Sequence, residues 1–140
     1  EKRREALYEE LSLRAAYVGV ARLEAGDIDR INILQATRLC MESCARQAVG
    51  GVVLVDAVTG LRLPGEQKVL AHGDAASYMI AAASIIAKVT RDRWMAGQDA
   101  LYPQYGFARN KGYGTAEHIA ALKQYGPCPL HRRSFIAKFL

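Results

Sequence analysis

The chain has 140 residues, 51% of them hydrophobic, and a formal net charge of +5. This length predicts one α/β domain over residues 1–140, and no apolar run reaches the roughly 18 residues that a bilayer-spanning helix needs. The basic charge favours a polyanionic partner, and the odd number of cysteines, three, favours a reducing, cytoplasmic location.

The first part of the chain is expected to form a helix, a strand and a second helix, over residues 1–13, 17–21 and 28–49. Asp27 follows a glycine and is the expected N-cap of the second helix, which Gly50 and Gly51 end. Cys40 and Cys44 lie four residues apart and would share a face of that helix. They are either two zinc ligands or, more often for such a spacing, two small core residues.

A strand that ends in an acid follows the two glycines. Val52–Asp56 is a continuous apolar run, which is typical of a strand buried on both faces. Ligands bind at the carboxyl ends of strands in open α/β sheets, so Asp56 is placed for chemistry, although a turn or capping aspartate is an equally good interpretation. A second strand is expected over residues 68–71, leading directly into Gly73 and Asp74.

Residues 74–93 are expected to form one long helix, because the segment has no proline, no glycine and many strong helix formers. Helical spacing predicts burial nearly all round, with a narrow polar stripe that includes Asp74, Ser77, Ser84 and Lys88. Such a stripe either faces a charged ligand or belongs to a core helix that Asp74 merely caps.

The last third of the chain combines basic and aromatic residues. Residues 102–114 have no periodicity and are expected to form a long loop, whereas Thr115 is the expected N-cap of a helix that Gly126 ends near residue 125. His118 on this helix and His131 in a basic tail are expected at the surface, and His72 could line a site beside Asp74. Mixed basic and aromatic residues suit a nucleic-acid surface.

Two acids at the strand end and the helix start, Asp56 and Asp74, are the candidate chemical centre. Paired carboxylates serve either in acid–base catalysis or in binding Mg²⁺ or Mn²⁺, and the metal interpretation fits a basic protein that meets phosphodiesters. The absence of G-x-x-x-x-G-K-[ST], G-x-G-x-x-G and G-x-S-x-G elements argues against a nucleotide switch, a dinucleotide enzyme and a serine hydrolase.

Seven segments, in order along practically the whole chain, resemble ribonuclease HII, the bacterial type 2 ribonuclease H. They are Ile31–Thr37, Leu54–Asp56, Gly73–Ala75, Ala81–Arg93, Tyr105–Phe107, Lys111–Thr115 and Gly126–Phe135. The resemblance implies a ribonuclease H-like fold, in which a mixed sheet is flanked by helices. It also implies a monomer that cleaves the RNA strand of RNA–DNA hybrids, and single ribonucleotides in duplex DNA, with two divalent ions.

The resemblance assigns roles to individual residues. Asp56 matches the third metal-binding acid of the family and Asp74 the fourth. Tyr113 matches the tyrosine that packs against the sugar at the RNA–DNA junction. Supporting or backbone-contacting roles, a weaker assignment from position and charge, fall to Ser84, Lys88, Lys111, Arg132 and Arg133.

The chain also departs from the family. The family's opening Asp-Glu-Val-Gly-Arg-Gly element, with its first two acids, is absent, and the chain starts at Glu1 without a methionine. We therefore expect an N-terminally truncated protein with little or no activity; the alternatives are a non-catalytic hybrid-binding module and a helical scaffold domain. Smaller departures are Ala57, where the family usually has glycine, and Arg109-Asn110 before Lys111.

Overall fold

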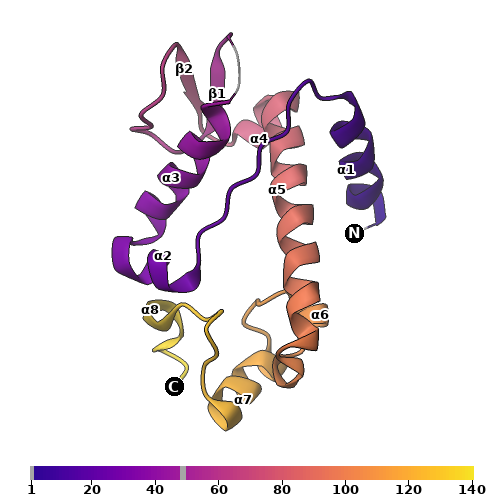
Figure 1. Cartoon of the computed structure of the whole chain (residues 1–140), viewed down its shortest axis with the longest axis vertical. Helices are drawn as coiled ribbons and strands as arrows, with labels where there is room; N and C mark the ends of the chain where they lie inside the picture. The colour runs from indigo at the N-terminus through magenta and orange to yellow at the C-terminus, as the bar shows by residue number, and fades with distance from the viewer. Residues whose placement is uncertain (1, 48–49) are drawn as a thin grey trace. The chain divides into compact units, whose positions relative to one another are not determined.

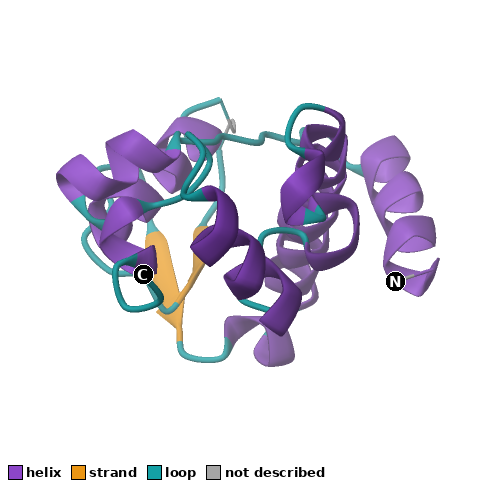
Figure 2. Ribbon diagram, turned by 90° about the horizontal axis from the view of Figure 1, so that it is seen from below, coloured by secondary structure: helices purple, strands orange, loops and turns teal. Residues whose placement is uncertain are grey.

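The computed structural model describes residues 2–47 and 50–140 and has the α/β composition expected from the sequence (Figures 1 and 2). The strands are β1 (Val53–Asp56) and β2 (Gln67–Leu70). The α-helices are α1 (Lys2–Arg14), α2 (Ala25–Ile31), α3 (Ile33–Ala45), α4 (Gly73–Ala76), α5 (Tyr78–Gly97), α6 (Phe107–Asn110), α7 (Ala116–Tyr125) and α8 (Arg133–Ile136), with 3₁₀ turns η1 (Gln98–Ala100) and η2 (Pro103–Tyr105). In the described ranges, no helix is both long and apolar enough to cross a membrane.

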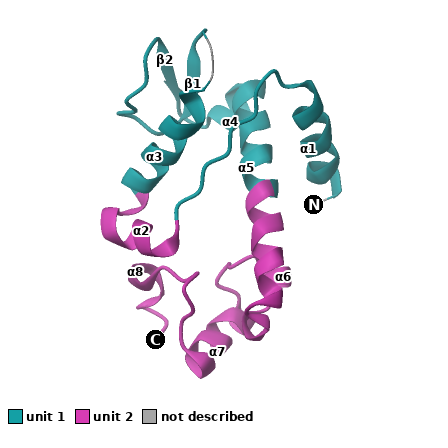
Figure 3. Ribbon diagram, in the orientation of Figure 1, with its two compact units in different colours: residues 1–23, 34–89 teal, residues 24–33, 90–140 magenta. Residues whose placement is uncertain are grey.

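The chain divides into two compact units (Figure 3). Unit 1 comprises residues 1–23 and 34–89, and unit 2 comprises residues 24–33 and 90–140. The boundary between Val89 and Thr90 falls inside α5. The single domain expected from the sequence stays a prediction.

The sheet of unit 1 is a parallel pair of strands. Val53 pairs with Gln67, and the register continues to Asp56, which pairs with Leu70. Val55 is the buried residue of β1, and the other three residues of the strand are only partly buried. The prediction of a strand buried on both faces is therefore wrong, because an apolar run is fully buried only where neighbouring elements cover both faces.

The expected long helix is two helices, α4 and α5, separated at Ser77. Ser77 has extended backbone (φ −140°, ψ 124°), and its carbonyl accepts the first hydrogen bond of α5 from Ala81 N–H at 2.9 Å. This is the backbone state of an N-cap residue, so α5 starts as a separate helix. The predicted all-round burial is also wrong, since Tyr78 is 96% exposed and Met79 73% exposed. The buried residues of this helix are Ile80, Ile86, Val89 and Met95.

Two further predictions in the first 50 residues are wrong. Residues 17–21 form an irregular segment in place of a strand, because an apolar run becomes a strand only where a neighbour supplies hydrogen-bond partners. The expected helix 28–49 is divided into α2 and α3 at Asn32, whose backbone (φ 68°, ψ 164°) is neither helical nor the left-handed helical state and interrupts the helix. The predicted end near Val49 lies outside the described residues; α3 ends at Ala45.

Asp27 does not cap α2. Glu24 holds the N-cap position, and Asp27 lies in the first turn, where its Oδ1 accepts a hydrogen bond from Arg30 Nη2 at 2.7 Å. A carboxylate in the first turn still favours the helix, because it lies near the positive end of the helix dipole. The identity of the helix was predicted correctly and its start was not.

Unit 2 is built around one hydrophobic cluster: Met95, Tyr105, Phe107, Ala121, Leu122 and Ile136. The expected loop 102–114 contains two short helical pieces, η2 and α6. Thr115 is confirmed as an N-cap, because its Oγ1 accepts a hydrogen bond from His118 N–H at 3.3 Å, and Gly126 ends α7 as predicted. The basic tail includes the short helix α8.

Candidate functional site

Asp56 is the last residue of β1 and is half-buried. Its Oδ1 accepts a hydrogen bond from the backbone N–H of Gly73 at 2.9 Å. Gly73 is buried at the start of α4, and a Cβ at this position would lie 2.5 Å from Ile80 Cδ1. A side chain at this position would therefore require Ile80 to move and would crowd the Asp56 carboxylate, whose Oδ1 lies 3.3 Å from the same Cβ position.

Asp74 follows Gly73 directly in the chain, so the hydrogen bond between Gly73 and Asp56 also places the backbone of Asp74 near Asp56. Asp74 is exposed in the first turn of α4, and α4 packs against both β1 and β2. Asp56 and the start of α4, which carries Asp74, thus both lie at the carboxyl end of the parallel pair, where α/β sheets bind ligands. The joint role of the two acids stays a prediction.

A strained turn follows Asp56. Ala57 has a φ of 56°, and Val58 N–H donates to Asp56 O at 2.7 Å, which closes a three-residue turn. Ala57 N–H continues the ladder by donating to Leu70 O at 3.0 Å. A left-handed state at a residue with a Cβ costs free energy, and here it stands directly beside the candidate acid.

The described residues do not complete a metal centre. They contain no cluster of three His, Cys, Asp or Glu side chains that could hold an ion. Hard divalent cations take six or more oxygen ligands, so two carboxylates are a partial donor set. Cys40 and Cys44 are free, half-buried thiols on α3, and burial raises the pKa of both. They therefore do not belong to a zinc cluster of the described residues.

An apolar groove in unit 1 relates Asp56 to part of the predicted polar stripe. Asp56 and Ser84 both line it, together with Cys40 and Cys44, whereas its described lining includes neither Asp74 nor Lys88. Ser84 is exposed and Lys88 half-buried on α5. The sequence predicts that Asp74 shares a helical face with these two residues. That prediction is wrong, because Ser77 interrupts the helix between Asp74 and Ser84. His72 is exposed before α4, and its role stays a prediction.

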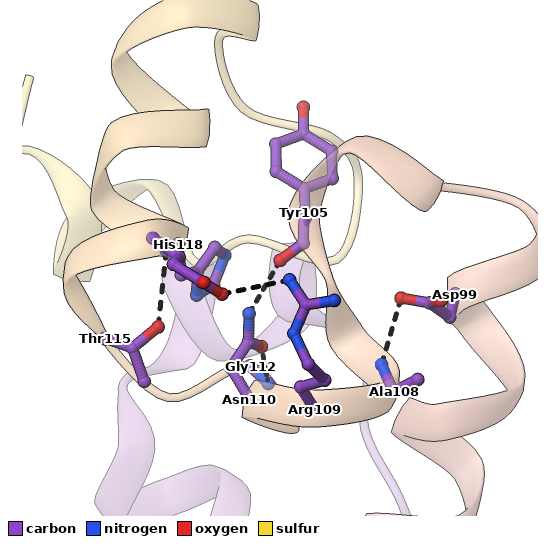
Figure 4. A network of polar contacts seen from close by, with 9 residues as sticks. Asp99, Tyr105, Ala108, Arg109, Asn110, Gly112, Thr115 and His118 are labelled. Atoms are coloured by element: carbon purple, nitrogen blue, oxygen red, sulfur yellow. Dashed lines mark hydrogen bonds and ion pairs between the residues drawn. The ribbon is translucent and has the colours of Figure 1, made fainter.

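In unit 2, a braced turn precedes Tyr113. Asn110 is buried; its Nδ2 donates to Tyr105 O at 2.6 Å, and its Oδ1 accepts from Gly112 N–H at 2.8 Å (Figure 4). Lys111 and Gly112 are both left-handed, with φ of 50° and 77°. The Tyr113 side chain is 52% exposed.

Arg91 of α5 supports the same turn. Its Nη1 donates to Lys111 O at 3.0 Å, and its guanidinium carbon lies 5.1 Å from the centre of the Tyr113 ring. A cation and an exposed aromatic ring thus lie side by side, a combination that suits a nucleic-acid surface. Lys111 turns back onto this segment, because its Nζ donates to Ala108 O.

The prediction that His118 and His131 lie at the surface is wrong. They are only 3% and 8% exposed, and their Nε2 atoms are 2.9 Å apart. His118 Nδ1 lies 2.9 Å from Tyr113 O, and His131 Nδ1 lies 3.0 Å from Cys128 N. Sequence reasoning missed this pair because nothing local indicates that two histidines 13 positions apart face each other.

The tail presents the other predicted basic residues. The Arg132 guanidinium lies 4.7 Å from the centre of the Phe135 ring, and Lys138 Nζ lies 4.5 Å from the same centre. Arg133 is exposed, and its backbone N–H donates to Asp29 Oδ2 at 2.6 Å. The Ser134 hydroxyl donates to Asp29 Oδ1 and holds the pKa of that carboxyl below its usual value. Asp29 therefore anchors α8 to α2.

Comparisons with known proteins agree on one family. The family model described as Ribonuclease HII matches residues 1–138. A curated protein named Ribonuclease HII from Caldanaerobacter subterraneus subsp. tengcongensis is 47% identical, over all of this chain and 59% of its own length. Proteins of the same name from Lachnoclostridium phytofermentans and Geotalea daltonii are 51% and 47% identical, over 97% and 95% of this chain and 54% and 62% of their own lengths. The chain thus spans a little over half the length of these relatives.

Proposed function

The chain belongs to the ribonuclease HII family, and from this premise we propose that the complete protein is an endonuclease acting on RNA–DNA hybrids and on single ribonucleotides in duplex DNA. The observation that carries the proposal is the hydrogen bond from Gly73 N–H to Asp56 Oδ1 at 2.9 Å. It ties the strand-end acid to the start of α4, where the second acid, Asp74, follows.

Asp56 and Asp74 are proposed to hold Mg²⁺ or Mn²⁺ together with acids that this chain does not contain. A bound divalent ion supplies an activated water and charge stabilisation at a phosphodiester, and the proposed products carry 5′-phosphate and 3′-hydroxyl ends. The chain's own contribution is placement. The bond from Gly73 fixes the Asp56 carboxylate, so the acid needs little reorganisation when a substrate phosphate arrives.

Tyr113 is proposed to pack against the ribose at the junction between RNA and DNA. Its exposed ring, the adjacent Arg91 guanidinium and the hydrogen-bonded backbone beneath it support this role. Lys111, Arg132 and Arg133 are proposed to contact the phosphate backbone, with Ser84 and Lys88 as supporting residues. A monomeric state and a cytoplasmic location stay predictions from the sequence.

For the 140-residue chain itself we propose binding without turnover, which is the second candidate function. Two carboxylates are too few to hold two ions. The aromatic rings of Tyr113 and Phe135 nevertheless have the guanidinium groups of Arg91 and Arg132 beside them, which suits binding. Binding should weaken steeply with salt, because contacts to phosphates release counterions. Robust hybrid cleavage by this chain alone would contradict the proposal, and lack of binding at low salt would favour a scaffold.

The catalytic proposal is tested by Asp56→Asn in a protein joined upstream to the corresponding segment of a family member, including its Asp-Glu-Val-Gly-Arg-Gly element. The variant should lose Mg²⁺-dependent cleavage of a duplex that contains one ribonucleotide. The matched control is Glu66→Gln, which removes an exposed carboxylate beside β2 whose ion pair with Lys68 is solvent-accessible. Cleavage retained by the Asp56 variant would exclude its role.

A further inference from the structure

The buried pair His118 and His131 shares one proton between two facing nitrogens. Their Nε2 atoms are 2.9 Å apart, so one must donate and the other accept. Both rings pack among the aromatic residues of unit 2: the Tyr105 ring centre lies 4.9 Å from that of His131, and the Phe107 ring centre lies 5.5 Å from that of His118. The two histidines are therefore part of the core and not surface groups.

The groups at the two ends of the pair determine where the protons lie. Tyr113 O can only accept, so His118 Nδ1, at 2.9 Å, carries a hydrogen. Cys128 N–H can only donate, so His131 Nδ1, at 3.0 Å, is bare; the Cys128 thiol, 3.2 Å away, can donate to the same nitrogen. Cys128 O also lies near this nitrogen, at a longer 3.3 Å, and it already accepts a hydrogen bond from His131 N–H at 3.0 Å.

With both rings neutral, one arrangement satisfies the three shortest contacts of the two rings, and the longer contact between Cys128 O and His131 Nδ1 is not a hydrogen bond in it. Cys128 N–H donates to His131 Nδ1, His131 Nε2–H donates to His118 Nε2, and His118 Nδ1–H donates to Tyr113 O. We call these three hydrogen bonds the histidine relay. It runs in one direction, from the turn at Cys128 to the backbone of Tyr113.

The relay ends at the residue whose side chain is presented for binding. The Tyr113 carbonyl also accepts from Thr115 N–H at 2.8 Å, and Tyr113 N–H donates to Asn110 O at 2.8 Å. The backbone is thus held on both sides while the ring stays 52% exposed. An exposed aromatic side chain on a fixed backbone loses little conformational entropy when a ligand stacks on it.

We propose that His131 and His118 are positioning residues, which act through the histidine relay to hold Tyr113 in the orientation that recognises a ribose. The proposal rests on the proposed function of Tyr113. It differs from a packing role, because packing needs only the volume of the two rings, whereas positioning needs their particular protonation.

Protonation of His131 would break the relay. It would place a hydrogen on Nδ1, facing the Cys128 N–H donor. The titratable groups that face His131 are His118 of α7, Cys128 of the turn before it and Tyr105 of η2. Burial, with a smaller contribution from His118, lowers the pKa of His131, which keeps the ring neutral near pH 7.

The first test measures the tautomers of the unaltered chain at pH 7.5 by long-range ¹⁵N–¹H correlation of the imidazole rings. We expect the Nδ1–H form at His118 and the Nε2–H form at His131. An Nε2–H form at His118 would overturn the relay. This measurement requires neither substrate binding nor a folded variant, so it separates the relay from the proposed function.

The second test compares His118→Asn with His118→Gln. An asparagine amide can take the place of Nδ1 and donate to Tyr113 O, whereas a glutamine amide reaches the place of Nε2 and leaves that carbonyl without its donor. Fluorescence anisotropy gives the Kd for a duplex with one ribonucleotide and for the same duplex in DNA. The preference is the ratio of the Kd for the DNA duplex to the Kd for the duplex with one ribonucleotide. This ratio should fall roughly five- to tenfold in the Gln variant and should stay close to that of the unaltered chain in the Asn variant.

Each outcome of the binding test has a distinct meaning. The positioning role would be overturned if both variants and the unaltered chain showed the same preference. It would also be overturned if the Gln variant lost the same affinity for both duplexes, because that result indicates packing alone. Lack of preference in the unaltered chain would overturn the proposed role of Tyr113 and, with it, recognition through the relay. In that case the tautomers would still decide whether the relay exists.

Discussion

Replacing Ala57 with glycine should stabilise unit 1 although it removes a methyl group. Ala57 has a φ of 56°, where a side chain with a Cβ costs about 1–2 kcal/mol. Glycine avoids that cost but loses about 0.5–1 kcal/mol more conformational entropy on folding than alanine. Both backbone hydrogen bonds of the turn, Ala57 N–H to Leu70 O and Val58 N–H to Asp56 O, are kept. We expect a net gain of about 0.5–1 kcal/mol in the free energy of unfolding.

The assay is urea denaturation followed by far-ultraviolet circular dichroism, with equal denaturant slopes required for the comparison. The matched control is Ala87→Gly, the same substitution at an exposed, right-handed position of α5, which should destabilise by about 1 kcal/mol. The two variants should therefore shift the midpoint in opposite directions. A destabilisation by Ala57→Gly equal to that of Ala87→Gly would refute the strain at this turn.

Two further changes test unit 2. Gly112→Ala should destabilise by about 1–2 kcal/mol in the same assay, because φ is 77° and the new Cβ would stand 2.9 Å from the flexible end of Met95; an unchanged midpoint would contradict this. The pKa of His131 is lowered from 6.5 in the folded state, so as the pH decreases the unfolded chain takes up a proton on this histidine before the folded chain does. The free energy of unfolding should therefore fall as the pH decreases below about 6.5 and level off below the folded pKa. His131→Asn should remove that part of the pH dependence, as the difference between the two stability curves would reveal.

Local signals carried the successful predictions. Thr115 caps α7 through a hydrogen bond to a residue three positions away, and Gly126 ends it, so both ends are determined within a few residues. The strand-end position of Asp56 likewise follows from an apolar run and the acid that ends it. These features needed no knowledge of the rest of the fold.

The wrong predictions share the opposite property. Ser77 and Asn32 can continue a helix or break it, and their non-helical backbone states depend on where the flanking segments pack. The residues 17–21 become a strand only beside a suitable edge, which the sequence of this segment does not specify. His131, in the turn before α8, packs against His118 of α7, and this contact joins segments that are separate in the sequence.

The predictions for the candidate site also divide into residue types that the local sequence reveals and contacts that it does not. The residue types at Asp56, Asp74 and Tyr113 were evident from their motifs, but the support beneath them was not. The bond from Gly73 to Asp56 and the histidine relay beneath Tyr113 join positions well separated in sequence. Composition and periodicity carry no signal for such contacts.

The two-stranded sheet has a consequence for handling the isolated chain. Among the described residues, β1 and β2 pair only with each other, so each presents unpaired backbone groups along its outer side. Such edges are templates for pairing with another chain and favour aggregation at high concentration. Lys68, exposed within β2, opposes that association, because a charge on an edge strand must be desolvated before a second strand can dock. Replacement of this lysine by an apolar residue would therefore shorten the useful life of a concentrated sample before it changed the fold.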